Sequence, residues 1–188
     1  MRFKLFTYAT HSQGKFSELI NSHDITILGL GKKWHGFMDK FKGLKEALET
    51  EPDDLIVIFL DGFDSTICIH PKIAVYKYIQ KYPSLPLLCS YHCVFGNGFD
   101  SYINSKIFNG TANSGMYMGS VKNVKMMLQK AIELEIECKG DDQRALNKVL
   151  NSGIIDYVID ENKEIFQNLT ISERQHFCCG QVPFVSEP

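Results

Sequence analysis

An α/β fold with a mostly parallel central sheet, flanked by helices, is predicted for this chain of 188 residues. Segments with strand character alternate with segments of helical spacing through the first half of the chain, which is typical of parallel sheets covered by helices. One strand, at residues 55–60, is an unbroken apolar run rich in branched side chains. Such a run is expected where both faces of a strand are buried.

The first half of the chain supplies three strands and two helices. Apolar side chains predict a strand at 3–9, and a short helix follows at 14–21. A second strand at 25–28 leads into a glycine-rich turn. Residues 37–50 are predicted to be helical because apolar side chains recur at the spacing of one helix face. The apolar strand at 55–60 then ends in acidic residues.

The middle of the chain contains a helix, a strand and a long loop. A proline at the start and an apolar stripe predict a helix at 71–82. A strand is predicted at 87–91. Glycine and asparagine are dense from 96 to 113, as in a surface loop, and a short strand follows at 115–119.

Two helices, at 121–134 and 141–150, and a strand at 157–160 complete the predicted elements. The sequence shows no internal repeat, linker or low-complexity segment. Because the length is typical of one domain, we predict a single domain over residues 1–188.

The charge balance argues against general binding to anionic partners. Lysine and arginine total 20, aspartate and glutamate 22, and the formal net charge is −2. We therefore expect no nucleic acid partner and no electrostatic membrane binding. The chain has no apolar run of membrane-spanning length, and its start is too short and polar for a signal peptide. We expect a cytoplasmic or host-cytoplasmic location, and a lumenal one only if a leader has been lost.

The six cysteines lack the regular spacing of a disulfide scaffold or a zinc site, so free thiols in a reducing compartment are favoured. Sequons occur at Asn109 and Asn168. They matter only in a secreted protein.

Two acids at the end of the apolar strand are the most informative feature. Asp61 follows the strand directly, and Asp64 comes three residues later. Ligands of open α/β sheets bind beyond the carboxyl ends of the strands. Carboxylates are hard oxygen ligands suited to Mg²⁺ or Mn²⁺, which neutralise a diphosphate. The alternative is a solvated turn that caps a helix.

Further polar motifs occur at the ends of predicted elements. They are TYAT at 7–10, LGLGKKWHG at 28–36 followed by Lys40, NSG at 113–115 and DDQ at 141–143. Structural explanations are the alternative. Lys40 would then be an exposed helix lysine, the NSG motif a turn, and the two aspartates of DDQ an N-cap pair. Together they supply what a nucleotide-sugar enzyme needs: a metal clamp, a lysine for phosphate, amides for sugar hydroxyls and a second pair of acids.

The order of these motifs resembles the glycosyltransferase domain of the procollagen-lysine hydroxylase and glucosyltransferase family and its stand-alone viral and microbial relatives. The corresponding segments, between Thr7 and Leu169, are YAT, LGLGKKW, DKFKGL, FLDGFD, ANSGMYMG, GDDQ and IFQNL. The resemblance implies a GT-A glycosyltransferase fold that uses a UDP-sugar with Mn²⁺ or Mg²⁺.

The resemblance also implies roles for individual residues. The matching positions are Asp61 and Asp64 for the metal, Tyr8, Thr10 and Phe63 for the uridine, Lys40 for the diphosphate, Asn113, Ser114 and Gly115 for the donor sugar, and Asp141, Asp142 and Gln143 near the reacting carbon.

Two departures from the family pattern concern the metal and the acceptor. The third metal ligand of the family is a histidine, and Glu187 or water takes its place here. The acceptor segment lacks the tryptophan of the family and has His92 near the position of an acid, so the acceptor need not be hydroxylysine in collagen. No iron-binding second domain follows, so we expect no hydroxylase activity.

The expected activity is metal-dependent transfer of a hexose, glucose or galactose, from a UDP-sugar to a hydroxyl group on a collagen-like protein or a glycan. The alternative is a module that binds UDP or a UDP-sugar but has lost turnover. A phosphatase with an aspartate nucleophile is disfavoured. In such enzymes the second acid comes two residues after the first, whereas here Asp64 comes three residues after Asp61. A purely structural domain would bind no nucleotide.

Overall fold

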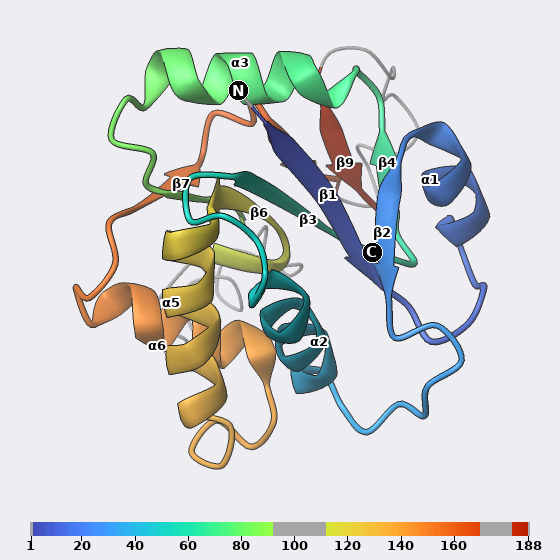
Figure 1. The fold of residues 1–188 in the computed structure, drawn as a ribbon, viewed down its shortest axis with the longest axis vertical. Helices are drawn as coiled ribbons and strands as arrows, with labels where there is room; N and C mark the ends of the chain where they lie inside the picture. The colour runs from blue at the N-terminus through green and yellow to red at the C-terminus, as the bar shows by residue number, and fades with distance from the viewer. Residues whose placement is uncertain (1, 92–111, 170–181, 188) are drawn as a thin grey trace, which may run out of the picture.

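The structure, a computed structural model, describes residues 2–91, 112–169 and 182–187 (Figure 1). A six-stranded sheet of order β2-β1-β3-β6-β5-β7 forms its centre, and a three-stranded sheet of order β4-β9-β8 lies beside it. The central strands are β1 (Phe3–Tyr8), β2 (Ile25–Leu28), β3 (Ile56–Asp61), β5 (Leu87–Tyr91), β6 (Ala112–Ser120) and β7 (Tyr157–Asp160). The small sheet contains β4 (Ser65–Ile67), β8 (Phe166–Asn168) and β9 (Phe184–Ser186).

The helices cover both faces of the central sheet. They are α1 (Phe16–Ser22), α2 (Met38–Leu48), α3 (Pro71–Lys81), α5 (Val121–Glu133) and α6 (Asp142–Asn151). Side chains of α2, α5 and α6 form one core against the sheet, and those of α1, α3 and the small sheet form the other. Figure 1 shows α5 and α6 side by side and α3 on the opposite side of the sheet.

Strand β3 lies between the two cores, as its apolar sequence predicts. Val57 and Phe59 point into the core of α2, α5 and α6, whereas Ile58 and Leu60 point into the other. All four side chains are fully buried. The alternation of a strand explains why a continuous apolar run is needed when both faces are covered.

The predicted strands and helices are confirmed, with differences of a few residues at their ends. The strand predicted at 115–119 is longer and begins at Ala112. It runs antiparallel to both of its neighbours, β3 and β5, whereas β1–β2, β1–β3 and β5–β7 are parallel. The loop predicted at 96–113 falls largely on residues 92–111, which lie outside the described part of the chain.

The small sheet was not predicted. Each of its strands has only three residues, too few to show an alternating pattern. Its assembly depends on the meeting of distant segments, since β9 pairs with β4 on one side and with β8 on the other. This sheet brings residues near the end of the chain next to the loop that follows β3.

The expectation of free thiols is wrong for Cys68. Cys89 and Cys138 are free and buried, but Cys68 is disulfide-bonded. Asn168, the asparagine of the second sequon, is buried, and its side-chain amide donates hydrogen bonds to Ser90 Oγ at 2.7 Å and to the Tyr91 carbonyl at 2.5 Å. Within the described residues, no helix is long and apolar enough to cross a membrane.

Candidate active site

The two acids that follow β3 occupy the carboxyl end of the central strands. Asp61 is the last residue of β3 and is paired in register with Tyr8 at the end of β1. Gly62 then turns the chain closely past β1, because a Cβ atom there would lie 2.6 Å from the Tyr8 carbonyl oxygen. Only glycine permits this approach, which holds the loop from Asp61 to Asp64 against the neighbouring strand.

Lys40 lies between Asp61 and a second acid, Asp142. Its Nζ atom is 3.3 Å from Asp61 Oδ2 and 2.6 Å from Asp142 Oδ2. Lys40 and Asp142 are both buried, whereas the Asp61 side chain is 30% exposed. Burial lowers the pKa of the Lys40 ammonium, but the charges of Asp61 and Asp142 outweigh it and raise that pKa well above its usual range. The three side chains therefore form one ion-pair cluster.

Helical spacing explains how Lys40 and Asp142 come to face inward. Lys40 precedes Leu44 by four residues on the buried face of α2. Asp142 precedes Leu146 by four residues on the buried face of α6. Residues four apart lie on the same side of a helix, so each polar side chain extends the apolar face of its helix up to the site.

The two acids of the DDQ motif have different positions. Asp141 is the N-cap of α6, and its Oδ1 atom accepts a hydrogen bond from the Arg144 amide at 2.9 Å. The helix-cap explanation is thus correct for Asp141, while Asp142 belongs to the cluster with Lys40. The third residue, Gln143, accepts a hydrogen bond through its backbone carbonyl from Asn147 Nδ2 at 2.8 Å.

Asp64 has a different environment from Asp61. Ser186 Oγ of β9 donates to Asp64 Oδ2 at 2.9 Å, and the Glu187 amide donates to the Asp64 carbonyl at 3.0 Å. Within the described residues, the buried Asp64 Oδ1 atom has no hydrogen-bond partner. Burial and the negative charge of Asp61 raise the pKa of Asp64 to about 6. Asp64 is therefore a half-buried acid that has no ion-pair partner among the described residues.

The predicted alternative ligand Glu187 already has a cationic partner. Glu187 Oε1 lies 2.6 Å from Lys15 Nζ. The Lys15 amide in turn donates to the Phe63 carbonyl at 2.8 Å. The segment after β1 and the end of the chain thus meet on either side of the loop that contains Asp64.

The start of β6 lies next to Asp61. Asn113 Oδ1 accepts a hydrogen bond from the Gly115 amide at 2.6 Å. A Cβ atom on Gly115 would lie 2.9 Å from Asn113 Oδ1 and 3.5 Å from Asp61 Oδ2. Ser114 between them is buried. The predicted sugar-facing loop and the first metal acid are therefore neighbours.

Asn147 of α6 is a site residue that the sequence analysis missed. It exchanges two hydrogen bonds with the backbone of Ala112, from the Ala112 amide to Oδ1 at 3.0 Å and from Nδ2 to the Ala112 carbonyl at 2.9 Å. This ties α6, which bears Asp142, to the first residue of β6. The sequence feature that could have identified Asn147 is a polar residue among the apolar residues of the inner face of α6.

Aromatic side chains flank the acids. The Tyr8 ring lies 5.9 Å from that of Trp34, and a Cβ atom on Gly29 or Gly43 would collide with the Tyr8 ring. Trp34 is 41% exposed. On the other side, the Phe63 ring lies 5.3 Å from that of His11, whose Nδ1 atom is 3.0 Å from Thr10 Oγ1.

The chemistry of the two acids suits a divalent cation. Asp61 and Asp64 are oxygen donors, and Asp64 combines an oxygen without a partner in the described residues with a raised pKa. A nearby cation would relieve that unfavourable charge. No cluster of three or more histidine, cysteine, aspartate or glutamate residues occurs in the part of the chain that the structure describes. Mg²⁺ is commonly held by one or two carboxylates together with water and substrate phosphates, so two acids suffice.

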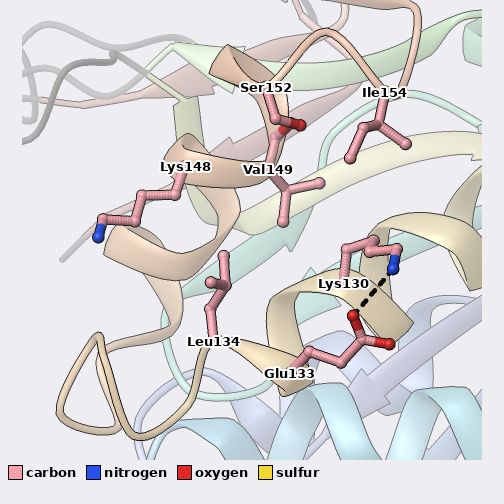
Figure 2. A pocket seen from close by; sticks show the side chains of 7 residues that line it. All are labelled: Lys130, Glu133, Leu134, Lys148, Val149, Ser152 and Ile154. Carbon is pink, nitrogen blue, oxygen red and sulfur yellow. Dashed lines mark hydrogen bonds and ion pairs between the residues drawn. The ribbon is translucent and has the colours of Figure 1, made fainter.

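A separate hollow lies between α5 and α6, with a volume of about 340 Å³ (Figure 2). Leu134, Val149 and Ile154 give it an apolar lining, and Lys130 at its edge is paired with Glu133 at 2.9 Å. None of the predicted site residues lines it. Its lining offers no acid free to bind a metal, so the site at the strand ends remains the candidate.

The fold is that of a glycosyltransferase. The crystal structure of a glycosyltransferase involved in the glycosylation of the major capsid of PBCV-1 matches with a TM-score of 0.66 and 11% sequence identity, over 99% of this chain and 93% of that one. A GT-A type of fold is consistent with the six-stranded sheet and its flanking helices.

The family model of the PLOD GT domain matches residues 2–177, and the chain belongs to this family. The resemblance expected from the motifs is thus confirmed, and family and fold together make the protein a glycosyltransferase. No curated protein matches the chain.

Proposed function

We propose that the protein transfers a hexose, glucose or galactose, from a UDP-sugar to a hydroxyl acceptor on a protein or glycan, with Mn²⁺ or Mg²⁺ bound at Asp61 and Asp64. The main support is the convergence of acids from separate elements at the carboxyl end of β3. Asp61 lies beside Asp64 on one side and beside the Lys40–Asp142 pair on the other. Such a site can hold a cation at a diphosphate and an acid at a sugar.

Asp61 and Asp64 would hold the cation through carboxylate oxygens. When bound, the cation would neutralise charge on the leaving diphosphate, which is a large source of rate acceleration in such transfers. Glu187 pairs with Lys15 at 2.6 Å, so using it as a third ligand would require breaking an ion pair. We therefore assign the remaining positions to water and to the phosphates of the donor.

The nucleotide and sugar would lie on either side of the acids. Tyr8, Thr10 and Phe63 would line the uridine, with the exposed Trp34 beside Tyr8. The segment Asn113, Ser114 and Gly115 and the Asp142 carboxylate would face the hexose. Positioning of the donor against the acceptor hydroxyl can supply much of the remaining acceleration.

The role of Asp141 and Asp142 would depend on whether the transfer inverts or retains the configuration of the reacting carbon. In an inverting transfer, Asp142 or Asp141 would accept the proton of the acceptor hydroxyl while the bond to the diphosphate breaks. A retaining transfer needs no such base, and the acids, with Gln143 beside them, would orient the sugar.

A UDP-binding module without turnover is the second candidate. A specific observation favours it: the chain lacks the histidine that the family pattern leads us to expect as third metal ligand, and Glu187 at that place is bound to Lys15. Such a module would retain nucleotide and metal binding and would release no UDP from a donor.

Calorimetric titration of UDP-glucose, UDP-galactose and UDP, with and without Mn²⁺, tests the proposal when combined with an assay of UDP release. We expect metal-dependent binding and slow, donor-specific release of UDP by hydrolysis. Binding without release of UDP from either donor would favour the module. Absence of nucleotide binding with or without Mn²⁺ would refute both candidates.

A further inference from the structure

Lys40 differs from the other lysines of its helix. Lys42 and Lys45 lie on the outer side of α2, where they pair with Glu135 at 2.8 Å and Glu49 at 2.9 Å. The Lys40 side chain is only 9% exposed and points into the site. The exposed ion pairs of Lys42 and Lys45 contribute little to stability. Burying a cation such as the Lys40 ammonium, in contrast, is costly unless it is well paired. The position of Lys40 therefore requires an explanation.

The partners of Lys40 are acids of the protein. Its ammonium lies 2.6 Å from Asp142 Oδ2 and 3.3 Å from Asp61 Oδ2. An ammonium has three hydrogen-bond donors and carries its charge as a compact point. Its pairing with the buried Asp142 and the partly exposed Asp61 therefore leaves the ammonium poorly placed to serve as the diphosphate ligand that the motif predicts.

The partners of Asp142 in the described part of the chain are few. Among the described residues, Lys40 is the cation within ion-pair distance of the Asp142 carboxylate. The Tyr117 ring, fully buried between Phe41 and Phe59, lies on the inner side, and the negative charge of Asp142 is among the causes that raise the pKa of its phenol. Lys40 is thus the positive charge that faces Asp142 in the described part of the structure.

We propose that Lys40 is a positioning residue that couples the metal acid Asp61 to Asp142, the acid assigned to the sugar, and that it is not a ligand of the diphosphate. The proposal rests on the metal-dependent function above. A cation at Asp61 would repel the ammonium and strengthen its pairing with Asp142. Occupancy of the metal position would thereby hold Asp142 in place for the sugar, and by linkage the state of Asp142 would affect metal affinity.

A double-mutant cycle on Mn²⁺ affinity tests this coupling. The variants are Lys40→Met, Asp142→Asn and the double variant, with Lys45→Met as a control on the outer side of α2. Mn²⁺ is titrated alone and with saturating UDP, and unbound Mn²⁺ is followed by electron paramagnetic resonance. Coupling energies between contacting residues are commonly large enough for such a cycle.

We expect Lys40→Met to tighten Mn²⁺ binding about fivefold, because a like charge beside the metal acid is removed. We expect Asp142→Asn to weaken it about fivefold in the wild-type background, because Lys40 is then left with Asp61 alone. In the Lys40→Met background, the ammonium that links Asp142 to Asp61 is gone, so substitution of Asp142 should change the affinity less than about twofold. Lys45→Met should leave the affinity unchanged.

Additive effects in the cycle would overturn the proposal. So would a loss of about tenfold or more in metal-free UDP affinity in Lys40→Met, since charge-assisted contacts to phosphate are strong. If Lys40→Met does not fold, the Mn²⁺ affinity of Asp142→Asn is the test. An affinity equal to that of the wild type would then overturn the proposal. Failure of the wild-type protein to bind Mn²⁺ even with UDP would instead refute the metal-dependent function.

Discussion

Asp61 and Asp64, the two acids of the loop after β3, are three residues apart, yet their carboxylates have different partners. On one side, Asp61 lies 3.3 Å from Lys40, which also pairs with Asp142. On the other side, the Asp64 carboxylate receives a hydrogen bond from the Ser186 hydroxyl, and no lysine or arginine of the described residues lies within ion-pair distance of it. Asp61 thus has a cationic partner within the protein, whereas Asp64 has none among the described residues, and the proposed function assigns that place to a bound divalent cation.

The largest effect is expected from Asp64→Asn, which removes the uncompensated acid and keeps its size. The affinity for UDP in the presence of Mn²⁺ should fall about 100-fold, because one of two charged oxygen ligands is lost. Calorimetry at saturating Mn²⁺ measures this change. Asp54→Asn, an exposed acid before β3, is the matched control and should bind as the wild type does. Unchanged affinity in Asp64→Asn would contradict the metal assignment.

The second-largest effect is expected on the pH dependence of the free energy of unfolding, to which Asp64 should contribute. Asp64 has a pKa of about 6 in the folded protein, raised from 3.8 by burial and by the charge of Asp61. A raised pKa means that the stabilisation is fully present below pH 4 and is lost as the pH rises through 6. In metal-free buffer, the wild type should lose on the order of 2 kcal/mol of unfolding free energy relative to Asp64→Asn between pH 4 and 7.5.

Urea unfolding of both proteins in the presence of a chelator measures this difference, because all other titrating groups are common to the two. Asp64→Asn should be the more stable protein at pH 7.5, and the two should converge near pH 4. Saturating Mn²⁺ with UDP should reverse the order at pH 7.5. A difference that does not vary with pH would show that the charge of Asp64 is well compensated in the folded protein.

The sequence predicted the fold where its signals were long and local. The apolar strand β3 and the amphipathic face of α2 were recognised because their patterns extend over whole elements. The small sheet was missed since its strands are three residues long. The antiparallel direction of β6 was also beyond prediction, because direction depends on where a connection returns and not on side-chain pattern.

The residues of the candidate site were proposed from the sequence, but their contacts with one another were not. Asp61, Asp64, Lys40 and Asp142 could be named from motifs at element ends. That Lys40 is buried between Asp61 and Asp142 depends on how α2 and α6 pack on the sheet. The contact of Ser186 with Asp64 spans 122 positions in sequence, so nothing local could have predicted it.

The smallest effect is expected on the Asp61 side, from Gly115→Ala. The added Cβ atom would lie 2.9 Å from Asn113 Oδ1, a fully paired oxygen, and 3.5 Å from Asp61 Oδ2. Asn113 must then move, while Asp61 can remain paired with Lys40. We expect affinity for a UDP-hexose to fall about fivefold with Mn²⁺ affinity nearly unchanged, in keeping with the loss of about one hydrogen bond.

Gly119→Ala on the same strand is the matched control, because its Cβ atom would meet the core side chains of Leu87 at 3.3 Å and Val124 at 3.5 Å. It should lower the melting temperature and leave ligand affinity unchanged, since overpacking of a core costs stability. Calorimetry with UDP-hexose and with Mn²⁺ separates the two outcomes for Gly115→Ala. Loss of Mn²⁺ affinity equal to the loss of sugar affinity would show that Asp61 is not held by Lys40 but by the backbone of β6, and the contrast between the two acids would then rest on Asp64 alone.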